Sequence, residues 1–115
     1  MGYHWIRIFE SAAEFENYIQ PNTFVVFELK GEKICVTRTS KGAFAVQDRC
    51  PHNGASLSKG FCTAKNEIVC PLHRYSYDLE TGKGTSGGGF ALKTYPIRKE
   101  ENGVFVGIKA RWWEM

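Results

Sequence analysis

The sequence lacks a long apolar stretch, and no unbroken apolar run is longer than Phe24–Phe27. A membrane-spanning helix needs roughly 20 predominantly apolar residues, so none is predicted. No charged-then-apolar leader of the secretory type opens the chain. We therefore expect a cytoplasmic protein, and because thiols stay reduced there, its cysteines indicate metal binding rather than disulfides.

A large excess of one charge is also lacking. Fifteen Lys and Arg residues against 12 Asp and Glu residues give a formal charge of +3, and the basic residues are spread along the chain. A nucleic-acid-binding surface is therefore not indicated. The 115 residues, 43% of them hydrophobic and 14% aromatic, suffice for one domain with a core but not for two.

Most of the patterning is of the strand type. Runs of β-branched and aromatic residues are separated by turn residues such as Asn102-Gly103, a strong hairpin signal. The expected strands cover residues 23–29, 33–39, 43–48, 75–79, 91–99 and 104–110. Ser11 with Glu14 three residues later predicts the start of one short helix. The fold class that follows is mainly β, with antiparallel sheets arranged as a sandwich or partial barrel.

Histidine is scarce, and two of the three histidines lie with three of the four cysteines between Cys50 and His73. Cys50 and His52 stand two apart, Cys70 and His73 stand three apart, and 17 residues separate the pairs. Thiolate and imidazole together favour zinc, iron–sulfur or copper. Such a set can hold tetrahedral zinc, but here each segment supplies one Cys and one His. That arrangement suits a 2Fe-2S cluster whose two irons have different ligands.

The stretches CPHNGASL and CPLHRYSYD resemble the Rieske iron–sulfur signature, C-x-H followed by C-x-x-H. The similarity extends through GFALKTYPI and ENGVFVGI towards the end of the chain. The resemblance implies one 2Fe-2S cluster per chain, with Cys50 and Cys70 bound to one iron and His52 and His73 bound to the other.

The resemblance also implies the fold. The chain is similar to a single Rieske domain over residues 1–115. Such a domain is an antiparallel β-sandwich or partial barrel with two cluster-binding loops. The part that carries the cluster is expected at about residues 48–90. Within it Cys62 is expected to be a spare or buried thiol rather than a ligand, and the glycine-rich residues 81–89 are expected to form a third loop beside the cluster.

Three further residues are expected next to the cluster. The Tyr77 hydroxyl stands where a family tyrosine donates to a cysteine sulfur, and Tyr75 replaces a serine that in the high-potential branch donates to a bridging sulfide. Gly54 is expected to permit a positive φ behind the first loop. Hydrogen bonds to sulfur raise the midpoint potential, and at most one donor is expected here. The expected midpoint therefore lies in the lower half of the range of about −150 to +300 mV.

Two positions separate the chain from the Rieske proteins of respiratory and photosynthetic complexes, which carry a disulfide between the two loops. Here those positions hold Ala55 and Leu72. An oxygenase would also need a mononuclear iron site with two histidines and a carboxylate, and only His4 remains. The resemblance therefore implies an electron carrier that is not an enzyme by itself. Its expected partners are a flavin reductase and an oxygenase, with no nucleic acid, membrane or small-molecule substrate.

One departure and two alternatives stand beside this interpretation. Arg74 and Tyr75 occupy positions where ferredoxins of the family often have two small residues, and this stretch is more similar to the Rieske domains of oxygenases. The first alternative is a small Rieske-like subunit of another redox complex, such as a nitrite reductase. The second is a binding module held together by zinc, which moves no electrons.

Overall fold

The structure is a computed structural model, which describes residues 2–52, 54–72, 74–85 and 89–110. Its strands form three antiparallel sheets, ordered β1-β10-β9, β2-β3-β4-β8 and β5-β6-β7. The strands are β1 (Tyr3–Phe9), β2 (Phe24–Leu29), β3 (Glu32–Thr39), β4 (Gly42–Gln47), β5 (Phe61–Cys62), β6 (Glu67–Val69), β7 (Ser76–Asp78), β8 (Thr94–Tyr95), β9 (Ile97–Glu100) and β10 (Gly103–Lys109). Helix α1 (Ala12–Tyr18) and the 3-10 turn η1 (Leu57–Lys59) lie between them. The mainly β, antiparallel fold is as expected, and within the described ranges none of the sheets closes into a barrel.

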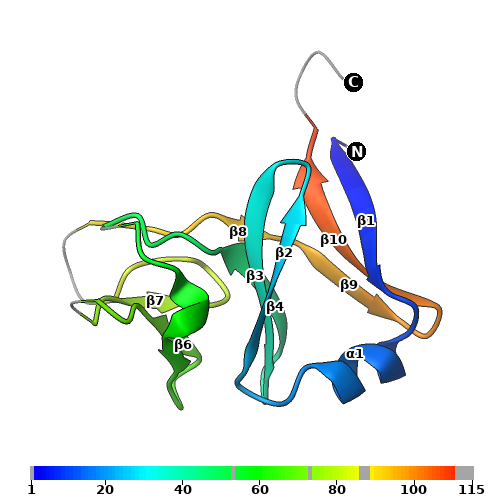
Figure 1. Cartoon of the computed structure of the whole chain (residues 1–115), viewed down its shortest axis with the longest axis horizontal. Coiled ribbons are helices and arrows are strands. Elements are labelled where there is room, and N and C mark those ends of the chain that lie inside the picture. The colour runs from blue at the N-terminus through cyan, green and yellow to red at the C-terminus, as the bar shows by residue number, and fades with distance from the viewer. Residues whose placement is uncertain (1, 53, 73, 86–88, 111–115) are drawn as a thin grey trace.

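A first core lies where the β1-β10-β9 sheet packs against the β2-β3-β4-β8 sheet, with α1 at one end (Figure 1). Its buried members are Phe9, Phe15, Ile19, Ile34, Val36, Ala45, Tyr95, Val104, Val106 and Ile108. Burying each large apolar side chain contributes about 1.5–3 kcal/mol. This core packs the two sheets and α1 together, and none of its members is a predicted metal ligand.

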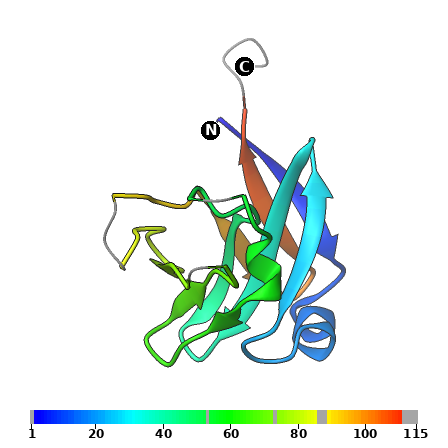
Figure 2. The ribbon, with the colours of Figure 1, turned by 60° about the vertical axis from the view of Figure 1, so that its left-hand side comes forward.

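A second core lies between the β2-β3-β4-β8 sheet and the lobe that contains β5, β6 and β7, which Figure 2 brings forward. Its buried members are Cys35, Val46, Cys50, Leu57, Ile68, Cys70, Tyr77, Leu79 and Leu92. Successive side chains of a strand point to opposite faces, so Ile34 and Val36 of β3 enter the first core while Cys35 enters the second. The central sheet is therefore covered on both faces, which explains the continuous apolar run in β3.

The structure corrects the expected strands in three places. Residues 91–99 form two strands rather than one, because Pro96 has no N–H to continue a ladder. β8 pairs with β4, and β9 pairs with β10, so the chain passes from one sheet to another at this proline. β1 was not among the expected strands, although Tyr3–Phe9 alternates in exposure and pairs with β10. The short strands β5 and β6 were not expected either.

The helix begins as predicted. The Ser11 side chain accepts a hydrogen bond from the Glu14 backbone N–H at 3.0 Å. The Glu14 carboxylate accepts from the backbone N–H of Glu10 at 2.7 Å, one residue before the position that a capping box uses. At the other end the Arg38 guanidinium donates to the backbone carbonyls of Glu16 and Ile19. No described helix is long and apolar enough to cross a membrane.

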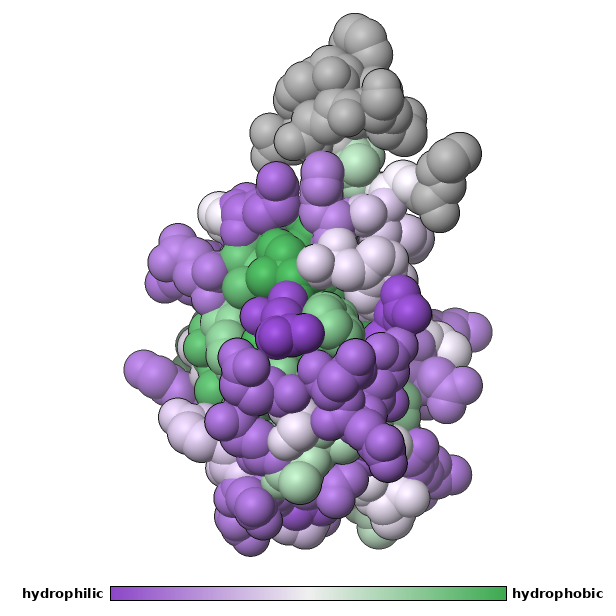
Figure 3. Space-filling view, turned by 90° about the vertical axis from the view of Figure 1, so that its right-hand side faces the viewer, coloured by the Kyte–Doolittle hydropathy of each residue, from purple (hydrophilic) through white to green (hydrophobic). Residues whose placement is uncertain are grey.

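The face formed by β1, β9 and β10 carries a mixed surface. Figure 3 shows hydrophilic side chains over most of this side, with a smaller hydrophobic group between them. Tyr3 and Trp5 are exposed on β1, and the Arg98 guanidinium lies 5.1 Å from the Trp5 ring centroid. Charged side chains thus interrupt the apolar area on this face.

A buried carboxylate, that of Asp48, joins the two ends of the segment that follows β4. Asp48 is 5% exposed, and its side chain accepts from the Ser56 hydroxyl at 2.6 Å and from the Ser58 backbone N–H at 3.0 Å. Its backbone carbonyl accepts from the Leu57 N–H at 2.6 Å. These bonds hold together the two ends of the segment that contains Cys50.

We expect Asp48→Ala to lower the free energy of unfolding by about 1–3 kcal/mol, because partly buried donors at Ser56 and Ser58 lose their acceptor. Chemical denaturation followed by circular dichroism measures the change. Glu101→Ala, at an exposed position in the β9–β10 turn, is the control and should stay within about 0.5 kcal/mol of the unmodified protein. An equal effect of the two substitutions would contradict the role given to Asp48.

Candidate metal centre

Two loops of matching construction carry the predicted ligands. The Cys50 N–H donates to the Ala55 carbonyl at 2.8 Å, and the Cys70 N–H donates to the Tyr75 carbonyl at 2.8 Å. Each bond joins a cysteine to the residue five positions later, so each loop folds back on its own first residue. The first loop (residues 50–55) follows β4, and the second loop (residues 70–75) connects β6 to β7.

The same position in each loop adopts a left-handed backbone. Gly54, four residues after Cys50, has φ +79°, and Arg74, four residues after Cys70, has φ +56°. The positive φ expected at Gly54 is confirmed. A side chain in this region costs roughly 1–2 kcal/mol that glycine does not pay. The second loop therefore has the same backbone conformation at this position as the first, although Arg74 adopts it less favourably than a glycine would.

The two cysteines of these loops meet in the second core. Cys50 is 2% exposed and Cys70 is fully buried. The Tyr77 hydroxyl lies 3.3 Å from the Cys50 sulfur. Burial raises the pKa of Tyr77 well above its ordinary value, and the hydrogen bond to Cys50 and the charges of Cys50 and Cys70 raise it further. Tyr77 is thus protonated, and its hydroxyl lies within hydrogen-bond distance of the Cys50 sulfur.

The imidazole of His52 lies among aromatic rings. It is half-buried with its Nδ1 atom buried, and it stacks on the Tyr75 ring at 4.0 Å between centroids and an interplanar angle of 12°. The Phe90 ring meets it edge-on at 5.2 Å. His73, the fourth predicted ligand, lies outside the described residues. Within the described residues, no three His, Cys, Asp or Glu side chains form a group that could hold a metal ion.

The other two cysteines occupy packing positions. Cys35 is buried in the second core, and Cys62 is half-buried against it. Burial raises the pKa of both thiols; at Cys35 the nearby charges of Asp48 and Cys62 add to the effect. Neither lies in one of the two loops.

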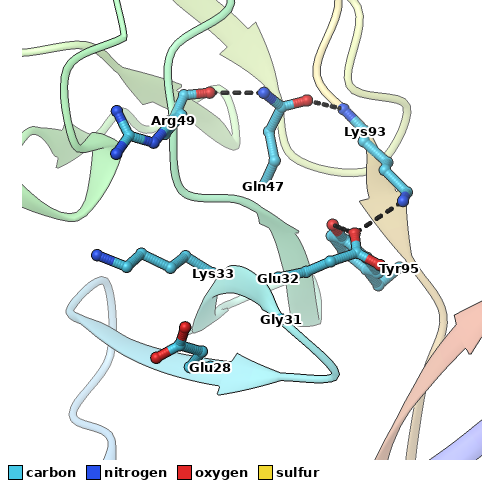
Figure 4. Close-up of a pocket in the computed structure, with 8 residues that line it drawn as sticks. All are labelled: Glu28, Gly31, Glu32, Lys33, Gln47, Arg49, Lys93 and Tyr95. Atoms are coloured by element: carbon cyan, nitrogen blue, oxygen red, sulfur yellow. Dashed lines mark hydrogen bonds and ion pairs between the residues drawn. The ribbon is translucent and has the colours of Figure 1, made fainter.

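A polar hollow of about 440 Å³ lies beside the base of the first loop (Figure 4). The Gln47 side chain crosses its upper edge, donating to the Arg49 carbonyl at 2.6 Å and accepting from the Lys93 N–H at 2.6 Å. Below it, the Glu32 carboxylate accepts from Lys93 Nζ at 2.8 Å and from the Tyr95 hydroxyl at 2.6 Å. The hydrogen bonds around the hollow thus connect Arg49, the residue before Cys50, to Lys93, which leads into β8.

Several residues that shape the site were not found by sequence reasoning. Phe90 and Gln47 reach it through contacts with residues far away in the chain, and no local spacing signals them. Asp48 had a local signal, since an aspartate at a strand end is followed by the two serines that it binds. The donor types themselves, two cysteine sulfurs and an imidazole, are those that an iron–sulfur cluster with mixed ligands requires.

Comparisons with curated proteins show two kinds of relative. The terminal oxygenase component of a carbazole 1,9a-dioxygenase from a Sphingomonas species is 35% identical over 91% of this chain. The ferredoxin subunit of a 3-phenylpropionate/cinnamic acid dioxygenase from Photorhabdus laumondii is 38% identical over 56% of this chain. The chain spans 29% of the length of the oxygenase component and 63% of the length of the ferredoxin subunit.

Solved structures share the fold. The ferredoxin of carbazole 1,9a-dioxygenase from Nocardioides aromaticivorans superposes with a TM-score of 0.78 at 23% identity, over 93% of this chain and 98% of that chain. A putative NADH-dependent nitrite reductase small subunit from Mycobacterium tuberculosis gives a TM-score of 0.80 at 20% identity, over 95% and 98%. A chain of the complex between reduced oxygenase and oxidised ferredoxin in carbazole 1,9a-dioxygenase gives 0.73 at 25% identity, over 88% and 99%.

The family model described as the Rieske [2Fe-2S] domain matches residues 9–96, most of the chain. This range includes both loops, their two cysteines and the predicted histidines. The chain therefore belongs to the Rieske [2Fe-2S] domain family.

Proposed function

We propose that this chain is a one-electron carrier that holds its 2Fe-2S cluster between the two loops. Cys50 and Cys70 would bind one iron through sulfur, and His52 and His73 would bind the other through imidazole nitrogen. The chain would form a single domain over residues 1–115. The cluster-binding part would extend over residues 48–90, in the cytoplasm.

The observation that supports this proposal most is the convergence of two matching loops on one core. Cys50 and Cys70 are 20 positions apart in the sequence, yet each starts a loop closed by the same hydrogen bond, and both sulfurs act on Tyr77. A cluster bound there supplies reversible one-electron chemistry. The described residues around it would keep water from the sulfur side, because Cys50, Cys70 and Tyr77 are buried.

The proposed partners are a flavin reductase that donates the electron and an oxygenase that accepts it. The ferredoxin subunit among the relatives and the solved complex of an oxygenase with a ferredoxin support this pairing. Electron transfer between such proteins needs a small, transient contact rather than a permanent interface.

A second candidate is supported by the longer of the two alignments. The carbazole dioxygenase component resembles this chain over 91% of its length but is itself more than three times as long. Arg74 and Tyr75 give the second loop the character of oxygenase Rieske domains. In this second candidate, the same domain would pass its electron to an oxygen-activating iron within one oxygenase. The nitrite reductase alternative is supported by fold alone.

Metal analysis and reconstitution test these proposals in order. Purified protein should contain two irons and two acid-labile sulfides per chain by the cluster's composition, with the electron paramagnetic resonance (EPR) signal of a mixed Cys/His cluster after reduction. Zinc without labile sulfide would refute the carrier function. Electron transfer from a flavin reductase to a separate oxygenase supports the ferredoxin role; transfer to a sirohaem nitrite reductase alone would overturn it.

We expect Cys70→Ser to lose the cluster, because a serine oxygen replaces the soft sulfur ligand that iron–sulfur centres require. The iron content should fall at least about tenfold, while far-UV circular dichroism reports whether the sheets remain. Cys62→Ser is the matched control, since it removes a thiol from the same lobe, and its iron content should stay at the unmodified level. Iron retained in Cys70→Ser would refute the ligand assignment.

We expect Tyr77→Phe to lower the midpoint potential. A cysteine bound to iron is a thiolate, so the hydroxyl 3.3 Å from the Cys50 sulfur can only donate to it, and this bond stabilises the more negative reduced state. A loss of roughly 1 kcal/mol corresponds to about 40 mV for one electron. Spectroelectrochemical titration measures the shift.

Tyr95→Phe is the control for this measurement. It removes a part-buried hydroxyl that donates to Glu32 at the polar hollow rather than to a predicted ligand. Its midpoint should equal that of the unmodified protein. A shift of the same size in both variants, or an upward shift in Tyr77→Phe, would contradict the assigned hydrogen bond.

A further inference from the structure

Three aromatic rings join the two ligand loops to the segment that follows residues 81–85. His52 comes from the first loop and Tyr75 from the second, and their rings are nearly parallel at 4.0 Å. Phe90, from the third segment, meets the imidazole at 69° and lies 6.0 Å from the Tyr75 ring. The His52 ring thus forms one stacked pair and one T-shaped pair with side chains that belong to other parts of the chain.

Tyr75 is itself held in place by the second loop. Its carbonyl accepts the N–H of Cys70, which is the bond that closes this loop. Its ring is half-buried and packs against the second core, as does the ring of Phe90. Two residues later, β7 places Tyr77 beside Cys50. The Tyr75 ring that stacks on His52 is therefore held in place by the same elements that position the cysteines.

A stacked ring restricts how an imidazole can turn. The nitrogen lone pair of histidine lies in the plane of the ring, so binding to iron requires one ring plane and not another. Offset-stacked aromatic pairs favour a defined plane. Partners that orient metal-binding side chains change metal affinity without touching the metal. The contact between His52 and Tyr75 has the geometry for such an effect.

We propose that Tyr75 is a positioning residue, whose ring holds the His52 imidazole in the plane needed for iron binding. The inference rests on the proposed function, because it treats His52 as a ligand. It goes beyond the expectation that Tyr75 replaces a serine donor, since the aromatic surface and not the hydroxyl carries the effect. It also explains why Tyr75, a bulky residue, occupies a position where many ferredoxins of the family have a small one.

Three substitutions in the purified, cluster-loaded protein test this inference. Tyr75→Phe keeps the flat ring and removes the hydroxyl, whereas Tyr75→Ala removes the ring. Tyr75→Leu keeps apolar bulk without a flat ring and replaces the alanine variant where that variant does not fold. Tyr18→Ala is the control, because the Tyr18 ring is 64% exposed and contacts Phe9 in the first core.

Two measurements are made on each variant: the half-life of the cluster absorbance under a chelator, and the histidine-nitrogen couplings of the reduced cluster by pulsed EPR. In Tyr75→Ala we expect the half-life to fall about tenfold, the lower end of the effect of such partners, and the nitrogen couplings to broaden. Tyr75→Leu should broaden them as well. Tyr75→Phe should match the unmodified protein in both measurements.

The inference is overturned if Tyr75→Ala loses its cluster no faster than Tyr18→Ala, or if Tyr75→Phe behaves like Tyr75→Ala. Faster loss with unchanged nitrogen couplings would also overturn it, since that result describes packing without positioning. If the unmodified protein holds zinc instead of a cluster, the proposed function fails by itself. The half-life of zinc retention in the same variants then decides the role of Tyr75.

Discussion

The burial of two cysteines in one core is the constraint on which the rest of the structure depends. Cys50 and Cys70 are buried at the start of their loops, so their own backbone N–H groups need an acceptor within the protein. Each donates the same hydrogen bond, to the sixth residue of its loop. The buried Asp48 closes the base of the first loop. The Tyr77 hydroxyl lies within hydrogen-bond distance of the Cys50 sulfur.

Much of the site is local in sequence and could therefore be predicted. The ligand spacing, Gly54 in its left-handed conformation and Tyr77 beside a cysteine all lie within a few residues of one another or of the motif. Phe90 could not be predicted, because it reaches His52 from beyond a glycine-rich segment. Gln47 likewise acts through Lys93, 46 positions later. Contacts of that separation depend on the fold, which local patterns do not specify.

The fold shows the same division. Strands β2, β3, β4 and β10 followed from β-branched runs and turn residues, since both are short-range signals. β1 has a strand-like alternation, but its partner β10 stands at the other end of the chain. Pro96 ended a strand as its chemistry requires, yet only the pairings of β8 and β9 show that the chain changes sheets there.

The presence of two separate cores has a consequence for motion. The first core has no predicted cluster ligand among its residues, whereas the second contains Cys50 and Cys70. Cooperative units of a protein often coincide with such separately packed regions and open with different free energies. When the cluster is lost, the lobe of β5, β6 and β7 should exchange its amide hydrogens far faster than the sheets around α1. The two sheets around the first core would then stay folded, and the lobe would refold against them when a cluster is inserted.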